Sequence, residues 1–243
     1  MISAKWEEGK PYMPWEIQSL DENKIEKCVK SYGREFWLKH HGAFLTRVYP
    51  KGTRFDSSNY NPLPGWAVGA QYVALNYQTP DEFFLLNQAL FSQNGKSGFL
   101  LKSSMMLGLP QLEAKTQTIS IEMISGSQIP KKTSAVFDDI VDPYVTMFFW
   151  SAADPNNRIQ IMQTPVVKNN GLNPVWRVKT QFKITEGEVN LLVIKVQDDD
   201  DTLLCWNALP LNCIRAGYRT IEMKSPDLKP LHAASLYCKV SIL

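Results

Sequence analysis

Residues 47–62 read RVYPKGTRFDSSNYNP, which begins as the end of an apolar strand and continues as a loop rich in turn-forming and polar residues. Loops that follow buried parallel strands carry the substrate contacts of barrel enzymes. Arg47 offers a planar fork of hydrogen-bond donors, and Tyr49 shares its face of the strand because residues i and i+2 point the same way. This pattern favours an anionic ligand. The alternative is that Arg47 pairs with a structural acid and that residues 56–59 form a self-bonded turn.

The same string belongs to a longer resemblance. Together with GAQYVALNYQTPD at 69–81 and SGFLLKSSMM at 97–106, it closely resembles the Y half of eukaryotic phosphoinositide-specific phospholipase C. The strings NPLPGW at 61–66 and LNQALF at 86–91 are most similar to the gamma class of that family. The resemblance continues to the C-terminus, and only the N-terminal residues match weakly.

Composition restricts the class of protein. The 243 residues suffice for one large domain or two small ones, and 26 basic against 24 acidic residues give a net charge of +2. This balance predicts no nucleic-acid partner. The four cysteines form no CxxC motif, which is typical of reduced thiols in an intracellular protein. Because no apolar run approaches the roughly 20 residues of a membrane span, membrane contact is expected to be peripheral.

The first part of the chain alternates apolar runs with helical spacing, and this alternation predicts βα units. A capping box formed by Ser19 and Glu22 predicts the first helix start, and Pro80 predicts another. Four strands are half of a closed (β/α)8 TIM barrel, and the resemblance to the Y half implies that residues 1–109 form its C-terminal half. The predicted strands cover 15–19, 43–49, 69–76 and 98–102.

The resemblance implies three substrate-binding residues, Ser19, Arg47 and Tyr49. Ser19 has two possible roles, because its hydroxyl could cap a helix, contact an inositol phosphate, or do both. Thr53 stands at a rim position that is tryptophan in some family members, and threonine there argues against deep insertion of this loop into a membrane.

The X half of the family barrel carries the catalytic histidines, the calcium ligands and two phosphate-binding lysines, and no segment here resembles it. No catalytic residue is therefore expected in this chain. Its three histidines are His40, His41 and His232. The first two precede a strand, at the non-catalytic end of a barrel, and all three are predicted to be surface residues.

The pattern changes after residues 110–117, which are predicted to connect two domains. Eight short strands with regular turn signals then predict an antiparallel β-sandwich over 118–243. The strings IVDPYV at 140–145, NNGLNPVW at 169–176 and AGYRTI at 216–221 resemble a C2 domain, the module that follows the Y half in this family.

C2 domains can bind calcium through several loop carboxylates. The resemblance offers Asp142, Asp198 and Asp200 as ligands. A short third loop and Thr202, near the position of a final acid, argue against tight binding, and the alternative is a solvated acidic loop. Four consecutive aspartates repel one another, so this loop is expected to be strained or mobile without a cation.

Two functions follow from the resemblance. The first is the C-terminal part of a phospholipase C that hydrolyses phosphatidylinositol 4,5-bisphosphate to diacylglycerol and inositol trisphosphate in intracellular signalling. That enzyme would be cytoplasmic, recruited to the inner face of the plasma membrane, and would use a catalytic Ca²⁺ in the X half. The alternative is an inactive protein with Y and C2 regions that binds lipid or a partner. Because half a barrel leaves open strand edges, an X half is expected in the same chain or in another, and the chain alone is predicted to be inactive.

Overall fold

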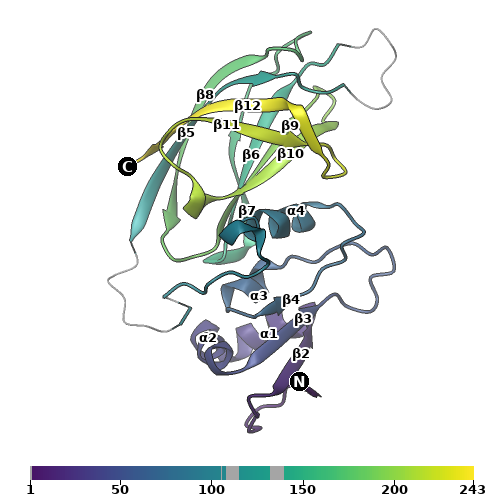
Figure 1. Ribbon diagram of the computed structural model, residues 1–243, viewed down its shortest axis with the longest axis vertical. Helices are drawn as coiled ribbons and strands as arrows, with labels where there is room; N and C mark the ends of the chain where they lie inside the picture. Colours follow the sequence, from purple (N-terminus) through teal and green to yellow (C-terminus); the bar gives the residue numbers. More distant parts are fainter. Residues whose placement is uncertain (1, 105, 108–114, 132–139) are drawn as a thin grey trace.

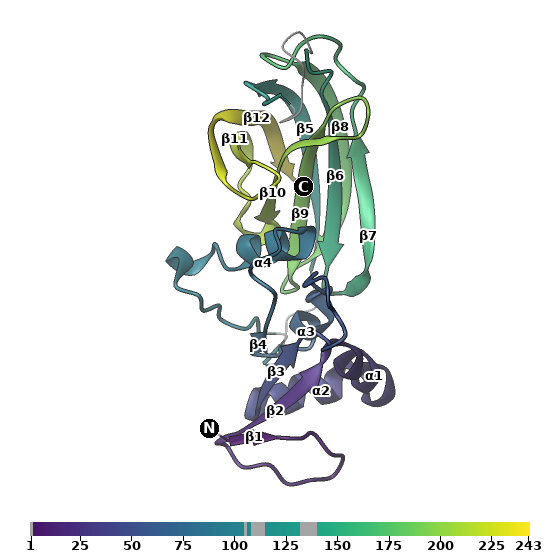
Figure 2. The same cartoon turned by 90° about the vertical axis from the view of Figure 1, so that its right-hand side faces the viewer.

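The computed structural model describes residues 2–104, 106–107, 115–131 and 140–243. They form two units stacked along the long axis of the molecule (Figure 1), a four-stranded parallel sheet with its helices and a larger antiparallel sheet structure. The predicted combination of half a TIM barrel and an antiparallel sandwich is confirmed. In the turned view (Figure 2), helix α4 (Glu82–Leu90) lies between the two units.

The half-barrel contains strands in the order β1-β2-β3-β4, all parallel. Two predictions about these strands were wrong. The first strand was not predicted, and residues 98–102 form no strand, because within the described chain no neighbouring strand pairs with them. The strands are β1 (Ile2–Ala4), β2 (Glu16–Asp21), β3 (Leu45–Tyr49) and β4 (Tyr72–Val73), and the helices before α4 are α1 (Glu22–Tyr32), α2 (Arg34–Ala43) and α3 (Leu63–Ala67), with the short η1 (Asn94–Lys96) after it.

The start of α1 differs from the predicted capping box. Asp21 is the N-cap, and its Oδ1 accepts a hydrogen bond of 2.9 Å from the Lys24 amide. Ser19 lies two residues earlier, inside β2. The carboxylate of Asp21 is one residue before the first helical position, where an acceptor best satisfies the open amides of a first turn. The Ser19 hydroxyl is therefore not needed for capping.

Side chains of β2 and β3 point alternately toward the helices and toward the open face of the sheet. Leu20 and Val48 are buried with Ile25, Trp37 and Val68 under the helices. Successive side chains of a strand point to opposite faces. The odd-numbered residues of β2 and β3 therefore face the other way, toward what is the interior of a closed barrel.

The sandwich consists of two four-stranded layers, β7-β6-β9-β10 and β11-β12-β5-β8. A single residue pair, Trp206 with Lys224, joins β10 to β11, so the continuous hydrogen-bonded order folds over there and encloses a core. The elements are β5 (Thr116–Ser127), β6 (Tyr144–Ser151), β7 (Asp154–Gln163), β8 (Val175–Thr185), β9 (Asn190–Gln197), β10 (Leu203–Pro210), η2 (Leu211–Cys213), β11 (Gly217–Lys224) and β12 (Pro230–Ile242). Most of the predicted connection at 110–117 lies outside the described residues, and the domain boundaries remain a prediction.

A second apolar core joins the two units. Strand β6 reads YVTMFFWS and is buried on both faces, which explains its nearly continuous apolar sequence. Val145 and Met147 point into the sandwich core. Phe148 and Trp150 point outward and pack with the α4 side chains, among them Leu86.

Charged groups reinforce this contact between the units. The Arg34 guanidinium donates to both carboxylate oxygens of Glu188 at 2.6 and 2.7 Å. Glu82, the first residue of α4, accepts from the Trp150 indole at 3.0 Å and pairs with Arg158 and Lys195 of the sandwich. Bidentate and charge-assisted hydrogen bonds of this kind fix orientation as well as distance.

Candidate functional site at the open face of the half-barrel

Strands β2 and β3 bring the three predicted substrate-binding residues together. Ser19 is directly opposite Arg47 in the parallel ladder, and Tyr49 lies two residues further along β3. The Arg47 guanidinium carbon is 4.9 Å from the centroid of the Tyr49 ring, a cation–π contact. Ser3 of β1 continues the row, with its Oγ 3.4 Å from Ser19 Oγ. The result is a row of polar groups on rigid strands.

Arg47 is the exposed cation of this row. Among the residues that the structure describes, no carboxylate pairs with its guanidinium. The structure therefore does not form the alternative structural ion pair. A guanidinium that stacks on a ring and retains its donors is well suited to bind phosphate oxygens.

A different arginine holds the loop that follows β3. Arg54 donates through Nε and Nη2 to Glu22 at 2.7 and 2.6 Å, and Glu22 also accepts from the Lys51 amide at 2.9 Å. Partial burial alone would raise the pKa of Glu22, but the hydrogen bonds from Arg54 and Lys51 outweigh it and lower the pKa. Sequence reasoning missed this pair because its members are 32 residues apart and lack a common motif.

The rest of this loop contains the self-bonded turn predicted from sequence. Asp56 Oδ1 accepts from the amide and the hydroxyl of Ser58, at 3.2 and 3.0 Å. Both hydrogen bonds favour the charged carboxylate and lower the pKa of Asp56. This turn fixes the backbone beside Arg54, whose Nη1 donates to Ser58 Oγ at 2.9 Å.

Asn59 connects the loop after β3 to the loop after β4. Its buried side chain donates to Asp81 Oδ1 at 3.0 Å and accepts from the Asn76 amide at 2.6 Å, and its own amide donates to Asp81 Oδ2 at 2.8 Å. Thr79 Oγ1 adds a bond of 2.7 Å to the Ser57 carbonyl. The two loops therefore form one rigid rim. Asn59 was missed because its partners follow it by about 20 residues.

Two aromatic side chains stand out from this rim. Phe55 is 92% exposed and Tyr77 is 67% exposed. They belong to the two loops that Asn59 joins, and Tyr77 is held by a ring contact of 4.7 Å with Phe84. Thr53, the rim position noted in the sequence, is also exposed.

The histidines are not placed as predicted in the half-barrel. His41 is buried, its Nδ1 lies 2.7 Å from the Val68 carbonyl, and burial lowers its pKa to about 3. His40 is half-buried, and burial lowers its pKa also. The surface prediction was wrong for both because the end of α2 packs against the sheet, but they do precede the N-terminal end of β3. His232 is exposed on β12, as predicted.

The acidic loops at the far end of the sandwich bring two of the three predicted calcium ligands together. Asp198 Oδ1 accepts from the Asp142 amide at 2.8 Å, whereas Asp200 accepts from the Thr202 amide of its own loop at 3.1 Å. Within the described ranges, no group of three acidic, histidine or cysteine side chains is arranged to hold a metal ion. Asp138 and Asp139, which precede Asp142 in the sequence, are outside the described residues.

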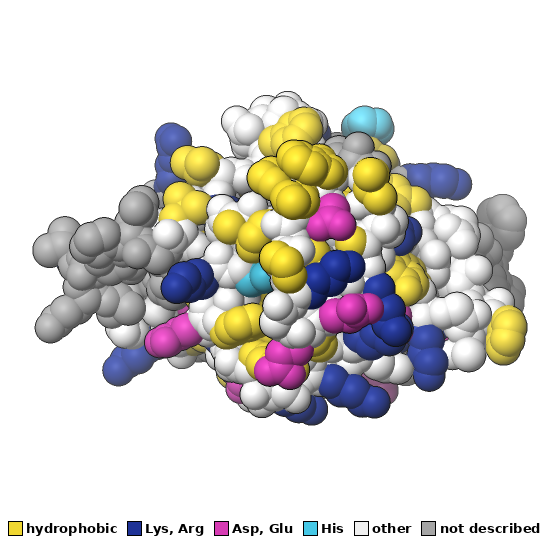
Figure 3. Space-filling view, turned by 90° about the horizontal axis from the view of Figure 1, so that it is seen from below, with side chains coloured by type: hydrophobic (Ala, Val, Ile, Leu, Met, Phe, Trp, Pro, Cys, Tyr) yellow, Lys and Arg dark blue, Asp and Glu magenta, His cyan; other side chains and the backbone are white. Residues whose placement is uncertain are grey.

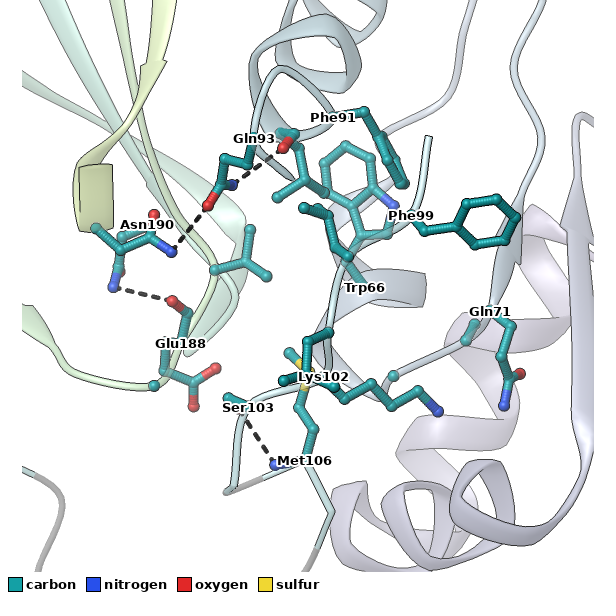
Figure 4. A pocket seen from close by; sticks show the side chains of 18 of the residues that line it. Trp66, Gln71, Phe91, Gln93, Phe99, Lys102, Ser103, Met106, Glu188 and Asn190 are labelled. Atoms are coloured by element: carbon teal, nitrogen blue, oxygen red, sulfur yellow. Dashed lines mark hydrogen bonds between the residues drawn. The ribbon is translucent and has the colours of Figure 1, made fainter. Parts of the chain in front are cut away.

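A cavity of about 630 Å³ lies between the half-barrel and the sandwich. In the close view (Figure 4), Trp66, Phe91 and Lys102 face Glu188 and Asn190 across it. None of the three predicted substrate-binding residues lines this cavity. One of its walls is the segment 98–103, which includes residues 98–102, predicted as a strand.

Side chains of different chemistry are mixed over the half-barrel end of the molecule. Viewed from that end (Figure 3), basic, acidic and apolar side chains alternate, in keeping with the net charge of +2. No field of one sign dominates the visible described surface, so ligand selection depends on individual groups such as Arg47. None of the helices in the described part of the chain is long and apolar enough to span a bilayer.

Comparison with known proteins agrees with this geometry. The family model "Phosphatidylinositol-specific phospholipase C, Y domain" matches residues 2–105, and the "C2 domain" model matches residues 117–219. The chain pairs a phospholipase C Y domain with a C2 domain. The solved crystal structure of L. pealei PLC21 is similar with a TM-score of 0.77 and 28% identity, over 93% of this chain and 30% of that chain.

Curated relatives of this Y–C2 chain include two enzymes named as phosphodiesterases of phosphatidylinositol 4,5-bisphosphate. The one from Dictyostelium discoideum is 34% identical, and the delta-4 enzyme from Bos taurus is 36% identical, each over 94% of this chain. The chain spans 30% of the length of these relatives. The gamma-class likeness remains a prediction, because several of the relatives carry delta names.

Proposed function

We propose that this chain supplies the substrate inositol-phosphate contacts and the C2 module of a phosphoinositide phospholipase C that hydrolyses phosphatidylinositol 4,5-bisphosphate. The observation that carries the proposal is the exposed Arg47, in register with Ser19 and stacked on Tyr49, with no carboxylate partner among the described residues. The names of the curated relatives support the choice of substrate.

Each residue of the row has a distinct task in this proposal. Arg47 binds a ring phosphate through its planar fork of donors. Tyr49 packs against the inositol ring and, by its cation–π contact of 4.9 Å, holds the guanidinium in place before substrate arrives. Ser19 donates its hydroxyl proton to a phosphate oxygen. Strands rather than loops carry all three, which gives the site its precision.

Cleavage itself is assigned to an X half. A general base must reach the attacking hydroxyl and titrate near the working pH. His41 is buried at the opposite end of β3 with a pKa of about 3, and His232 lies on the sandwich. The X half would supply the acid and base groups and the calcium ion that stabilises developing charge.

The segment 98–103 supports the presence of such a partner. Phe99 and Leu101 are 77% and 93% exposed, and in the described chain the backbone between them takes part in no sheet. The amide and carbonyl of Phe99 bond the side chains of Ser97 and Asn94, at 3.4 and 3.0 Å, and not another strand, so this apolar segment remains a template for strand pairing. The next strand of a closed barrel would use these groups.

The rim supports contact with a membrane surface, since the substrate is a lipid. Phe55 projects from a loop that Arg54 and Asn59 hold rigidly, so that insertion of its ring requires no reordering of the backbone. Phe55 thus offers the apolar contact that Thr53, two residues earlier, lacks. We assign Phe55 to peripheral contact with the lipid layer.

The substitution Arg47→Ala in a complete enzyme that contains this chain tests the proposal. Loss of charged hydrogen bonds to phosphate should lower turnover of phosphatidylinositol 4,5-bisphosphate about 10- to 100-fold. Turnover of unphosphorylated phosphatidylinositol should change much less. Lys51→Ala, which removes another exposed cation of the same rim, is the matched control and should retain the preference. An unchanged ratio of the two activities in Arg47→Ala would refute the assignment.

A further inference from the structure

A lysine lies between the acidic loops of the C2 domain. Lys168 Nζ is 3.0 Å from Asp142 Oδ2 and 2.5 Å from Asp199 Oδ2. Asp142 belongs to the loop before β6, and Asp199 to the loop between β9 and β10. One ammonium group therefore bridges two loops through Asp142 and Asp199, which are 57 positions apart in the sequence and whose negative charges repel each other.

The neighbouring carboxylate oxygens are engaged by protein donors. Asp142 Oδ1 accepts from the Asn169 amide at 2.5 Å. Asp198 Oδ1 accepts from the amides of Asp142 and Asp199 at 2.8 and 3.1 Å. Calcium takes six to eight oxygen ligands in a cage of roughly 2.3–2.6 Å contacts, and the described residues form no such group of carboxylates. The arrangement seen does not fit a calcium ion.

The backbone that carries Lys168 is itself fixed against the first loop. Asn169 adopts a left-handed conformation with φ of 54°, and its amide donates to Asp142 Oδ1. Gly171 lies so close to Val141 that a Cβ there would be 2.5 Å from a Val141 methyl carbon. This close approach requires glycine at position 171. It places the backbone segment that carries Lys168 beside the loop that contains Val141 and Asp142.

We infer that Lys168 is a built-in cation of this C2 domain, which joins the two acidic loops and disfavours binding of calcium between them. The four aspartates at 198–201 repel one another, and the ammonium group supplies the compensating charge. A divalent cation at this position must displace the lysine and then bear its repulsion. The affinity of a calcium site depends on the net charge of its ligands, so one fixed positive charge weakens it.

This inference is independent of the proposed substrate site. It concerns the opposite end of the molecule and would hold even if Arg47 bound no phosphate. The expectation that the aspartate run is strained or mobile without a cation stays a prediction, since the Lys168 ammonium group provides a cation there.

Calorimetric titration of the full 243-residue chain with CaCl₂ tests the inference. Lys168→Gln should bind calcium with a saturable heat and an affinity at least about tenfold above that of the unmodified chain, whose binding should be weak or undetectable in the same titration. Lys168→Arg keeps the charge and should resemble the unmodified chain. Lys179→Gln removes the same charge from an exposed position on β8 and should gain nothing. Adding Asp142→Asn and Asp198→Asn to Lys168→Gln should abolish the gained binding.

Thermal unfolding provides a second readout that does not depend on heats of binding. Lys168→Gln should melt at a higher temperature in calcium than in EDTA, because a ligand that binds the folded state stabilises it. The unmodified chain should melt alike in both. Calcium binding to the unmodified chain as tight as to Lys168→Gln, or no binding to either protein, would overturn the inference.

Discussion

The half-barrel and the sandwich differ in how the faces of their sheets are covered. The sandwich folds its strands into two layers and buries a core between them. The half-barrel covers one face of its sheet with helices and leaves the other face open. That open face carries Ser19, Arg47 and Tyr49, so the unit with an uncovered sheet face is the one that presents the proposed substrate-binding residues.

The contact between the two units determines how independent they are. Substitution of Arg34 by alanine should have the largest effect on stability, because it leaves Glu188, whose side chain is only 3% exposed, as a buried carboxylate without its bidentate partner. Breaking such a pair costs about 3–5 kcal/mol of unfolding free energy. Urea denaturation of the chain measures this change.

A double substitution provides the control for Arg34. Glu188→Gln combined with Arg34→Ala removes the buried charge and should recover most of the loss. If Arg34→Ala cost less than about 1 kcal/mol of unfolding free energy, the half-barrel would not depend on the sandwich through this pair. The two units would then be separable with respect to this contact.

The rim of the half-barrel should respond to pH. The pKa of Glu22 is below its ordinary value of 4.5, so its bond to Arg54 contributes stability above that value. This contribution is lost as the pH falls through the lowered pKa of the folded state. Arg54→Gln should cost about 1–2 kcal/mol at neutral pH and less in acid.

Urea denaturation between pH 7 and pH 3 measures this effect. The difference in stability between the unmodified chain and Arg54→Gln should shrink as the pH falls. Lys27→Gln, which removes an exposed cation of α1 that forms no ion pair among the described residues, serves as a control and should give a small, nearly constant difference. A gap between Arg54→Gln and the unmodified chain that stayed constant over this range would show that the ion pair does not hold the rim.

The smallest effect on stability is expected in the segment 98–103, which pairs with no strand of the described chain. Phe99→Ser and Leu101→Ser remove side chains that are mostly solvent-exposed, so unfolding free energies should change by no more than about 0.5 kcal/mol. Self-association of the chain, followed by sedimentation velocity, should nevertheless decrease. Phe55→Ser is the matched control, since it removes another largely exposed ring from a loop instead of a strand-like segment. A stability loss above about 1 kcal/mol would mean that the segment is already packed.

The sequence was most informative where structure is local or repeated. The i, i+2 spacing of Arg47 and Tyr49 correctly placed both on one face, and Asp56 with its neighbours formed the predicted turn. The succession of short strands and turn signals correctly predicted the sandwich. These signals depend on residues that are adjacent or nearly so in the chain.

Long-range partners could not be found in this way. The pairs Arg54 with Glu22 and Asn59 with Asp81 join residues 32 and 22 positions apart, and nothing in their local sequence specifies them. The segment 98–102 has the composition of a strand, yet a strand exists only where a neighbour pairs with it. The prediction failed because no strand of the described chain lies beside the segment, and not because its residues disfavour a strand.

Helix α4 gives the molecule a mechanical property. Its first residue, Glu82, accepts from the sandwich, and Asp81, one position earlier, holds Asn59 and with it the rim that carries Phe55 (Figure 2). A helix thus connects the sandwich to the loops beside Ser19, Arg47 and Tyr49. In the proposed contact with a lipid surface, a tilt of the C2 domain would be transmitted through this helix to the rim and would change the height of Arg47 above that surface.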